Sequence, residues 1–438
     1  MILSATLNRA RRQELLGAKV DTQAYPLITA MAHSQAPQEL PVIAELSRQT
    51  VRVQLQPNDQ TALEQALARA EQGQQVLWVE NTVKEAQSRY LDLAARAAEL
   101  NIECGLLHSR FTAVDRARLE AYWVDAFGKP GWQHRSARGR ILVGTQVLEQ
   151  SLDIDADFIV SRFAPTDMLL QRLGRLWRHT QTPRVRGAEC EAWLLAPDLA
   201  QAIQNPIAEF GATAHVYSAY VLCRSLQVWQ TRQQLYLPDD IRSLIEATYA
   251  EQQETAEMAR WLDELENGTR QRKGRQALRQ LARIGLALDG KTLPESQVQT
   301  RYSEADTFDV LILRNLQLLK EQQSSCLVLL DGQEVILPWQ RHRLSKLQWK
   351  KLTATLMRQL VSIRPSEAPA ATAPGVLEKY GLQHCFYLGS RDWQDDESLL
   401  RIALVDQAAM LHGLHGSAAH DKATLEYRTD LGYRFIKS

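Results

Sequence analysis

The chain has 438 residues, of which 45% are hydrophobic and 23% are charged, and its 51 Lys or Arg balance 51 Asp or Glu. This length allows two or three domains with cores of their own, and the composition indicates a soluble globular protein, because no apolar run approaches the ~20 residues of a membrane span and the N-terminus lacks the features of a signal peptide. The five cysteines are scattered and never stand in CxxC spacing, which predicts reduced thiols in a cytoplasm and excludes a disulfide framework or a zinc cluster.

The first 49 residues show one short strand pattern and then little periodicity. Residues 2–7 are apolar and contain a Ser4-Ala5-Thr6 turn, and a helical pattern follows them. Residues 22–50 contain three prolines and predict a surface loop that leads to a crossover.

From residue 50 to about 210, strand and helix patterns alternate. Strands are predicted at Thr50–Leu55, Val76–Val79, Cys104–His108 and Ala192–Leu195, with helices between them. This alternation is typical of an α/β fold with a parallel sheet and helices on both of its faces.

Residues 138–179 hold the most informative stretch of the chain. An apolar strand, Ile141–Val143, ends in Gly144-Thr145-Gln146, and a polar loop then leads to a second strand, Phe158–Val160. Loops that follow parallel strands lie at the carboxyl edge of the sheet, where ligands bind in such folds. We therefore expect a ligand site here.

The helix predicted for residues 167–179 carries Gln171, Arg175 and Arg178 at i, i+4 and i+7, so the three side chains are expected on one face. Apolar residues of the opposite face are expected to pack against the sheet. Arginine grips phosphate oxygens with a planar fork that keeps its charge. Between Arg135 and Arg186 there are nine Arg against five acidic residues, which favours a nucleotide or nucleic-acid site over a merely solvated helix.

Residues 211–299 predict a mostly helical linker, with helical patterns at 217–230, 241–249 and 256–288. Within it, the basic segment 270–275 is either a DNA contact or, more simply, a solvated turn between helices. A strand pattern at 310–313 opens the last region, and residues 300–438 predict a small C-terminal accessory domain.

Four segments resemble the motifs of superfamily 2 helicases. Residues 171–178, QRLGRLWR, are similar to motif VI, and Gly144 to Asp155 are similar to motif V. Residues 107–111, LHSRF, resemble motif IV, and Ser4-Ala5-Thr6 resembles motif III. The sequence TQVLEQSLDID followed by APTDMLLQRLGRLWRH is more specific than these motifs, and it resembles the CRISPR-associated helicase–nuclease of type I interference systems. The resemblance covers the C-terminal half of that family, from motif III onward, so residues 50–210 would be its second RecA-like domain and residues 1–49 a remnant of the first.

The resemblance also implies roles for single residues. Arg175 and Arg178 would be arginine fingers for ATP, with Gln171 orienting them or the γ-phosphate, and Asp153 would accept a hydrogen bond from the ribose. The remaining positions implied by the motifs are Thr145, Gln146, Ser109 and Arg110 as contacts of single-stranded DNA, and Ser4 and Thr6 as the coupling between nucleotide state and domain closure.

The motifs that the family carries before motif III are absent from the sequence. Residues 285–292 satisfy GxxxxGK[ST] by letter, but a helical pattern precedes them where a phosphate-binding loop needs a strand. The dipeptide His420-Asp421 stands alone, where the family's nuclease needs several metal ligands. We therefore expect no metal-binding residues in this chain. ATP and Mg²⁺ are expected only in a site that a first RecA-like domain completes. We also expect that this polypeptide alone neither hydrolyses ATP nor cleaves DNA.

The expected partners are single-stranded DNA, an RNA-guided CRISPR effector complex and a separately encoded N-terminal half if the protein is naturally split; no membrane is expected. Two other hypotheses stay open at this point. In the first, the chain is a non-catalytic module that binds DNA or the effector complex; in the second, it is half of a general superfamily 2 helicase.

Overall fold

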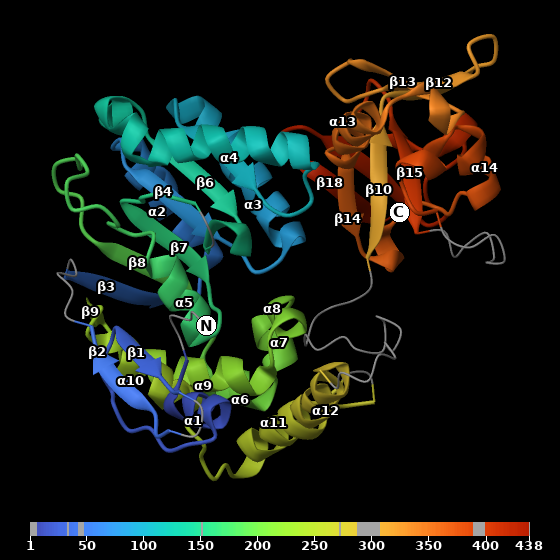
Figure 1. The fold of residues 1–438 in the computed structure, drawn as a ribbon. Helices are drawn as coiled ribbons and strands as arrows, with labels where there is room; N and C mark the ends of the chain where they lie inside the picture. The colour runs from blue at the N-terminus through green and yellow to red at the C-terminus, as the bar shows by residue number, and fades with distance from the viewer. Residues whose placement is uncertain are drawn as a thin grey trace. The chain divides into compact units, whose positions relative to one another are not determined.

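The structure, a computed structural model, describes residues 7–32, 35–42, 48–149, 152–270, 273–286, 307–388 and 399–437. The chain forms two compact units (Figure 1). The first unit comprises residues 1–105 and 123–304, and the second comprises residues 106–122 and 305–438. Each unit is described by itself.

A seven-stranded sheet forms the centre of the first unit, with the order β5-β6-β4-β7-β8-β3-β9. β4 pairs in parallel with β6 and β7, and β8 pairs in parallel with β7 and β3, whereas β9 is antiparallel to β3. The strands are β3 (Gln49–Gln56), β4 (Gln75–Val79), β5 (Glu103–Leu107), β6 (Arg140–Gly144), β7 (Phe158–Arg162), β8 (Glu191–Leu195) and β9 (Gln234–Leu237). The predicted α/β class with a large parallel sheet is confirmed.

Helices cover this sheet because their apolar stripes match its faces. α2 (Asp59–Glu71) buries Ala62, Ala66 and Ala70 at a spacing of four residues and packs against β4, β6, β7 and β8. α3 (Val83–Ala97) packs against β6. Asn58 and Thr82 accept hydrogen bonds from backbone N–H groups of the first turns, so both helices begin at a side-chain cap.

The region after β8 is helical, as expected, but differs in two places. β9 interrupts it, and the helix predicted for 256–288 is broken into α11 (Ala256–Asn267) and α12 (Arg275–Leu286). The break falls at Gly268, whose φ of +83° no helix allows, and Gly268 forms an isolated bridge with Lys273. The other helices are α6 (Leu199–Gln204), α7 (Pro206–Phe210), α8 (Thr213–Val216), α9 (Ala219–Trp229) and α10 (Asp240–Tyr249).

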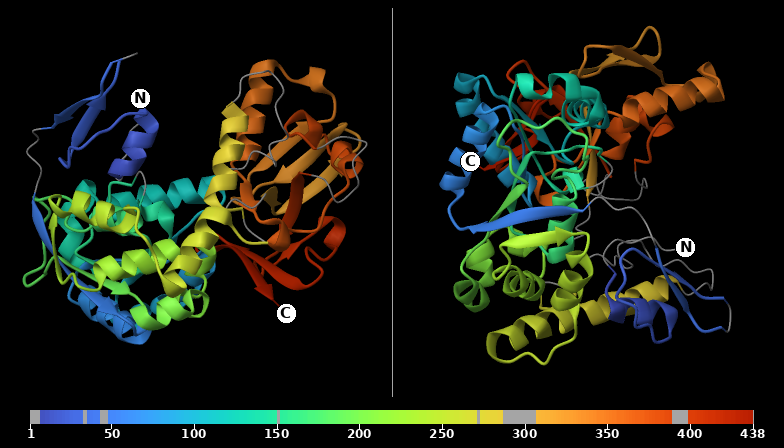
Figure 2. Two further views of the ribbon diagram at one scale, coloured as in Figure 1. Left: turned by 90° about the horizontal axis from the view of Figure 1, so that it is seen from below. Right: turned by 90° about the vertical axis from the view of Figure 1, so that its left-hand side faces the viewer.

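The N-terminal segment is more ordered than the predicted surface loop. α1 (Arg9–Leu16) is followed by an antiparallel hairpin of β1 (Leu27–Ala30) and β2 (Gln38–Pro41), which Figure 2 shows from two sides. The loop prediction was wrong here because one partly buried ion pair, Arg12 to Glu39 at 2.6 Å, joins α1 to β2 across a long stretch of sequence. The strand predicted for residues 2–7 lies almost wholly outside the described residues.

In its described residues, the second unit contains three small sheets and two apolar cores. β10 (Phe308–Leu313), predicted from the sequence, is the central strand of the order β14-β10-β15-β16. β15 pairs with it in parallel and β14 antiparallel. The other elements are β11 (Asn315–Leu319), β12 (Ser324–Val328), β13 (Glu334–Pro338), α13 (Lys346–Met357), β14 (Leu360–Ile363), α14 (Pro374–Lys379), β15 (Leu400–Val405), β16 (Leu411–His412), β17 (Ala423–Arg428) and β18 (Gly432–Lys437).

α4 (Ala113–Phe127) begins among the residues of the second unit and ends among those of the first. In the part of the chain that the structure describes, no helix combines the length and the apolarity that crossing a bilayer requires.

Candidate functional site

The helix that carries the QRLGRLWR motif is shorter than predicted. α5 (Thr166–Leu173) ends at Gly174, whose N–H donates to the Leu170 carbonyl at 3.0 Å. The chain then makes a tight turn, and Trp177 adopts φ +47°. Gln171 therefore lies on the helix, whereas Arg175 and Arg178 lie on the turn after it. The prediction that all three share one helical face was wrong, because the chain leaves the helix to pair with the segment after the motif V loop.

That pairing fixes the turn to the sheet. Leu176 forms a parallel bridge with Ala156, so that the Ala156 N–H donates to the Arg175 carbonyl at 2.8 Å and the Trp177 N–H donates to the Ala156 carbonyl at 3.0 Å. Leu169, Leu173 and Leu176 are fully buried, as predicted for the apolar side of the motif.

Arg175 is half-buried and rests on the motif V loop. Its two terminal nitrogens donate to the backbone carbonyls of Leu152 at 2.7 Å and Glu149 at 2.6 Å. Burial lowers the pKa of the guanidinium, and the charge of Arg178 lowers it further. Arg175 thus contacts neutral acceptors, and among the described residues it forms no ion pair with a carboxylate.

Arg178 and His179 share one carboxylate. Arg178 Nε and His179 Nε2 lie 2.9 and 3.0 Å from Asp153 Oδ1. Burial raises the pKa of this carboxyl, but the charges and hydrogen bonds of His179 and Arg178 outweigh that effect and lower it. Asp153 is exposed, and Gln171 is partly exposed on α5. The structure therefore brings Arg175, Arg178 and Asp153 together around the turn.

A buried ion pair that the sequence analysis missed lies beneath these residues. Arg172 and Glu149 are each 1% exposed, and Arg172 Nε donates to Glu149 Oε1 at 2.7 Å. Its other nitrogens donate to Ser161 Oγ, to the Arg162 carbonyl and to Asn81 Oδ1. A signal was present, because Arg172 stands within the apolar stripe of Leu169, Leu173 and Leu176, and a charge on a buried stripe needs a partner.

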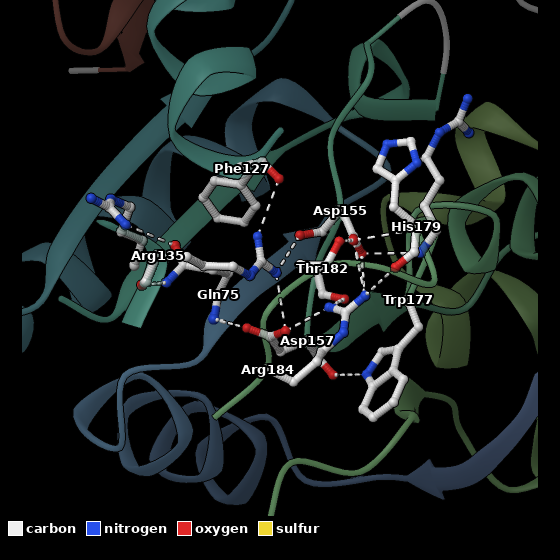
Figure 3. A network of polar contacts seen from close by, with 12 residues as sticks. Gln75, Phe127, Arg135, Asp155, Asp157, Trp177, His179, Thr182 and Arg184 are labelled. Atoms are coloured by element: carbon white, nitrogen blue, oxygen red, sulfur yellow. Dashed lines mark hydrogen bonds and ion pairs between the residues drawn. The ribbon is translucent and has the colours of Figure 1, made fainter. Parts of the chain in front are cut away.

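A second buried network anchors the segment after α5 (Figure 3). Asp155 is fully buried and accepts from the Arg178 N–H at 3.0 Å, from the His179 N–H at 3.4 Å and from the Thr182 hydroxyl. Arg184 Nη2 lies 2.9 Å from both oxygens of Asp155. The backbone that bears Arg178 is therefore held by a buried carboxylate.

The neighbouring Asp157 extends this network to the sheet. Its carboxylate accepts from Arg184 at 2.6 Å, from Arg135 at 3.0 Å and from the Gln75 N–H at 2.7 Å. Trp177 donates its indole N–H to the Asp157 carbonyl at 3.0 Å, and the Arg184 guanidinium lies over the Trp177 ring at 4.6 Å. Two buried carboxylates and two arginines thus join β4, the end of the motif V loop and the turn after α5.

Thr145 and Gln146, at the end of β6, are held by protein groups. Thr145 is buried, and the Gln146 amide donates to the Asn81 carbonyl at 3.0 Å and to the Tyr217 hydroxyl at 3.2 Å.

Ser109 and Arg110 belong to the second unit, on the turn after β5. Ser109 is exposed, whereas Arg110 forms an ion pair with Glu367. The Arg110 carbonyl accepts from the Tyr433 N–H at 2.8 Å. The predicted DNA contact Arg110 is therefore paired with a carboxylate of the C-terminal part of the chain.

The buried His108 side chain holds this turn through two hydrogen bonds. Its Nε2 donates to the Leu431 carbonyl at 3.1 Å, and its Nδ1 accepts from the Arg110 N–H at 3.1 Å. Burial lowers the pKa of His108 to about 3. The ring is neutral at pH 7, which both hydrogen bonds require.

The remaining predicted positions are less informative. Ser4 and Thr6 lie outside the described residues, as do residues 287–292 of the GxxxxGK[ST] match, while Gly285 stands within α12. The His420 ring packs edge-on against Phe435. Among the residues that the structure describes, no group of three or more His, Cys, Asp or Glu could hold a metal ion.

Comparisons with known proteins agree with these observations. Residues 72–181 match the family model described as CRISPR-associated nuclease/helicase Cas3, C-terminal. The CRISPR-associated endonuclease/helicase Cas3 of Escherichia coli K12 is 34% identical over 297 residues, which are 61% of this chain and 31% of that protein. The Cas3 of Streptococcus thermophilus is 30% identical over 274 residues, covering 57% of this chain and 27% of that protein.

Solved structures share the fold. The crystal structure of T. fusca Cas3 matches with a TM-score of 0.69 and 23% identity over 99% of this chain and 50% of that chain. The chain thus spans about a third of the curated relatives' length and half of the solved chain. The resemblance to the C-terminal half of a CRISPR-associated helicase–nuclease is confirmed.

We predict that Arg184→Met destabilises the first unit strongly. The substitution leaves the buried carboxylates of Asp155 and Asp157 without one of their cations. Removing one partner of a buried ion pair lowers the free energy of unfolding by about 3–5 kcal/mol. Urea unfolding of the purified chain measures this cost. Arg186→Met is the matched control, because Arg186 is exposed and only two residues away; equal midpoints for the two variants would contradict the role of the network.

We also predict that His108 makes the second unit sensitive to acid. Its pKa falls from 6.5 in the unfolded chain to about 3 in the fold, so its contribution is fully present above pH 6.5 and is lost as the pH falls towards 3. Between pH 7 and pH 5 the loss is about 2 kcal/mol. Urea unfolding of wild type and of His108→Gln at both pH values tests this, with exposed His342→Gln as control; an unchanged pH dependence in His108→Gln refutes it.

Proposed function

We propose that this chain, a relative of the C-terminal half of Cas3-type CRISPR-associated helicase–nucleases, supplies the second RecA-like domain of an ATP-dependent DNA helicase in antiviral defence. In this proposal Arg175 and Arg178 stabilise the charge that develops on the γ-phosphoryl group of ATP. The ATP itself is held by a first RecA-like domain, either from the same longer polypeptide or from a separate one.

The observation that carries the proposal is the state of the two arginines. Within the part of the chain that the structure describes, the terminal nitrogens of Arg175 donate to backbone carbonyls alone, and the Arg178 side chain is 39% exposed on the same turn. Phosphate oxygens are stronger acceptors for a guanidinium than neutral carbonyls are. Because Asp155 and the Ala156 bridge fix the backbone of the turn, only the side chains need to move to meet a nucleotide.

The other proposed nucleotide contacts follow from their positions. Asp153 accepts a ribose hydroxyl in this scheme, which requires that it share or release Arg178 and His179. Gln171, on the exposed side of α5, orients the γ-phosphate or the two arginines. Mg²⁺ and the phosphate-binding loop come from the first RecA-like domain, and Ser4 and Thr6 transmit the nucleotide state to domain closure.

We further propose that Thr145, Gln146, Ser109 and Arg110 contact the phosphates of single-stranded DNA. Thr145 and Gln146 follow β6 directly, at the carboxyl edge of the parallel sheet, which supports a ligand contact there. An RNA-guided CRISPR effector complex is the proposed protein partner, on the strength of the family relationship.

The proposal predicts that Arg175→Ala abolishes ATP hydrolysis in a reconstituted helicase while ATP still binds. Losing an arginine finger lowers the rate by about 10³–10⁵-fold. The chain is mixed with, or fused to, the N-terminal part of a relative that bears the phosphate-binding loop, and DNA-stimulated phosphate release is measured. Exposed Arg96→Ala is the control.

Two outcomes would contradict this assignment. The first is robust DNA-stimulated ATPase in the isolated chain, since the nucleotide would then be bound without a first RecA-like domain. The second is DNA binding that is indifferent to ATP and to Arg175→Ala in the reconstituted protein, which would favour a non-catalytic binding module.

A separate prediction concerns Arg110. Glu367 neutralises Arg110 in the absence of DNA, so Glu367→Gln should free the guanidinium for a phosphate and tighten single-strand binding, whereas Arg110→Ala should weaken it. Fluorescence anisotropy with a labelled oligonucleotide measures both. Weaker binding by Glu367→Gln, with the fold intact, would mean that the ion pair positions the turn and that Arg110 makes no phosphate contact.

A further inference from the structure

The second unit carries a basic surface that takes no part in the site described above. Residues 335–366 contain seven Lys or Arg and no Asp or Glu, although the whole chain is balanced in charge. All seven cations are exposed. They are Arg341, Arg343, Lys346, Lys350, Lys351, Arg358 and Arg364, and we call them the α13 basic surface.

α13 presents this charge on a well-anchored helix, which projects from the body of its unit in the second view of Figure 2. Ser345 and Gln348 form a capping box at its start, and Trp349 and Leu356 bury its inner face. Lys346 and Lys350 stand one turn apart on another face. The lysines are therefore fixed in spacing by a helix whose own position is set by the core.

A groove runs beside the two lysines. It has a volume of about 730 Å³ and lies between α13 and the residues around Arg341 and His384. Leu344, Trp349, Ala354 and Met357 contribute apolar lining, and the cations that border it are Arg341, Lys346 and Lys350. Met357 is 53% exposed, so part of this apolar lining faces solvent.

Within the described residues of the second unit, no ion pair neutralises the charge of this surface. Among the described residues, Lys346, Lys350 and Lys351 form no ion pair with a carboxylate, and Arg343 donates to the Gln322 carbonyl and to Gln323 Oε1, both neutral acceptors. Like charges this close repel one another, and the repulsion is relieved when a polyanion binds. A surface of this kind is suited to binding phosphate groups.

We propose that the α13 basic surface and its groove bind single-stranded nucleic acid, as a site separate from the motif residues. Exposed cations beside a groove with partly exposed apolar lining match the two features of a single strand, which are a phosphate backbone and unstacked bases. A duplex offers phosphates but keeps its bases inside, and an acidic peptide lacks planar apolar groups for the groove. This site goes beyond the proposed function, since it needs neither a nucleotide nor the arginine fingers.

The test is binding of a labelled single-stranded DNA to the full chain over a series of salt concentrations. Lys346→Gln with Lys350→Gln removes two phosphate contacts, so the slope of log affinity against log salt should become shallower by about 1.4. Met357→Ala should weaken binding with an unchanged slope, because it removes apolar contact and no charge. The matched control is Lys379→Gln with Lys437→Gln, two exposed lysines of the same unit.

The design separates this proposal from the motif contacts. The same double substitution is repeated in an Arg110→Ala, Thr145→Ala background, where the change in slope should persist; its loss there would assign the effect to the motif site. Thermal unfolding confirms that each variant is folded. A slope equal to that of the control overturns the proposal, and so does competition by a duplex or by polyglutamate as strong as by the single strand.

Discussion

The structure around the candidate site depends on carboxylates that are buried next to arginines. Asp155 and Asp157 are almost completely inaccessible, and they are compensated by Arg135, Arg184 and several backbone N–H groups. A charge in such surroundings tolerates little movement, because each lost hydrogen bond leaves an ion unsolvated. The two carboxylate oxygens of Asp155 accept hydrogen bonds from the backbone N–H groups of Arg178 and His179, so the same buried network also fixes the position of the turn.

Two kinds of arginine occur within a few residues of each other, and they differ in what satisfies them. Arg172 is enclosed, with Glu149 as counterion and three further acceptors. Arg175 and Arg178 are less enclosed, and the partners that the described residues offer to the terminal nitrogens of Arg175 are neutral. This contrast distinguishes one enclosed cation from two partly exposed ones, a difference that the sequence motif alone does not show.

The C-terminal part of the chain also holds the turn after β5, which belongs to the segment 107–111 that resembles motif IV. His108, Arg110 and Asp115 are held by Leu431, Glu367 and the Tyr427 hydroxyl, the last at 2.7 Å from Asp115. These partners lie more than 250 residues away along the chain. The small C-terminal region is thus built into the support of a helicase-like motif, and the α13 basic surface belongs to the same unit.

Much of the fold followed from the sequence, because strands such as Val76–Val79 and Phe158–Val160 are short apolar runs whose burial any parallel sheet requires. The motifs, with Arg175 and Arg178 among them, were also recognisable from local order. Tertiary structure alone decided that α5 ends at Gly174, that Arg172 is buried against Glu149, and that Arg110 meets Glu367. Each of these depends on a partner distant in sequence, and helical periodicity carries no information about such partners, since it describes which residues share a face and not what the fold places opposite them.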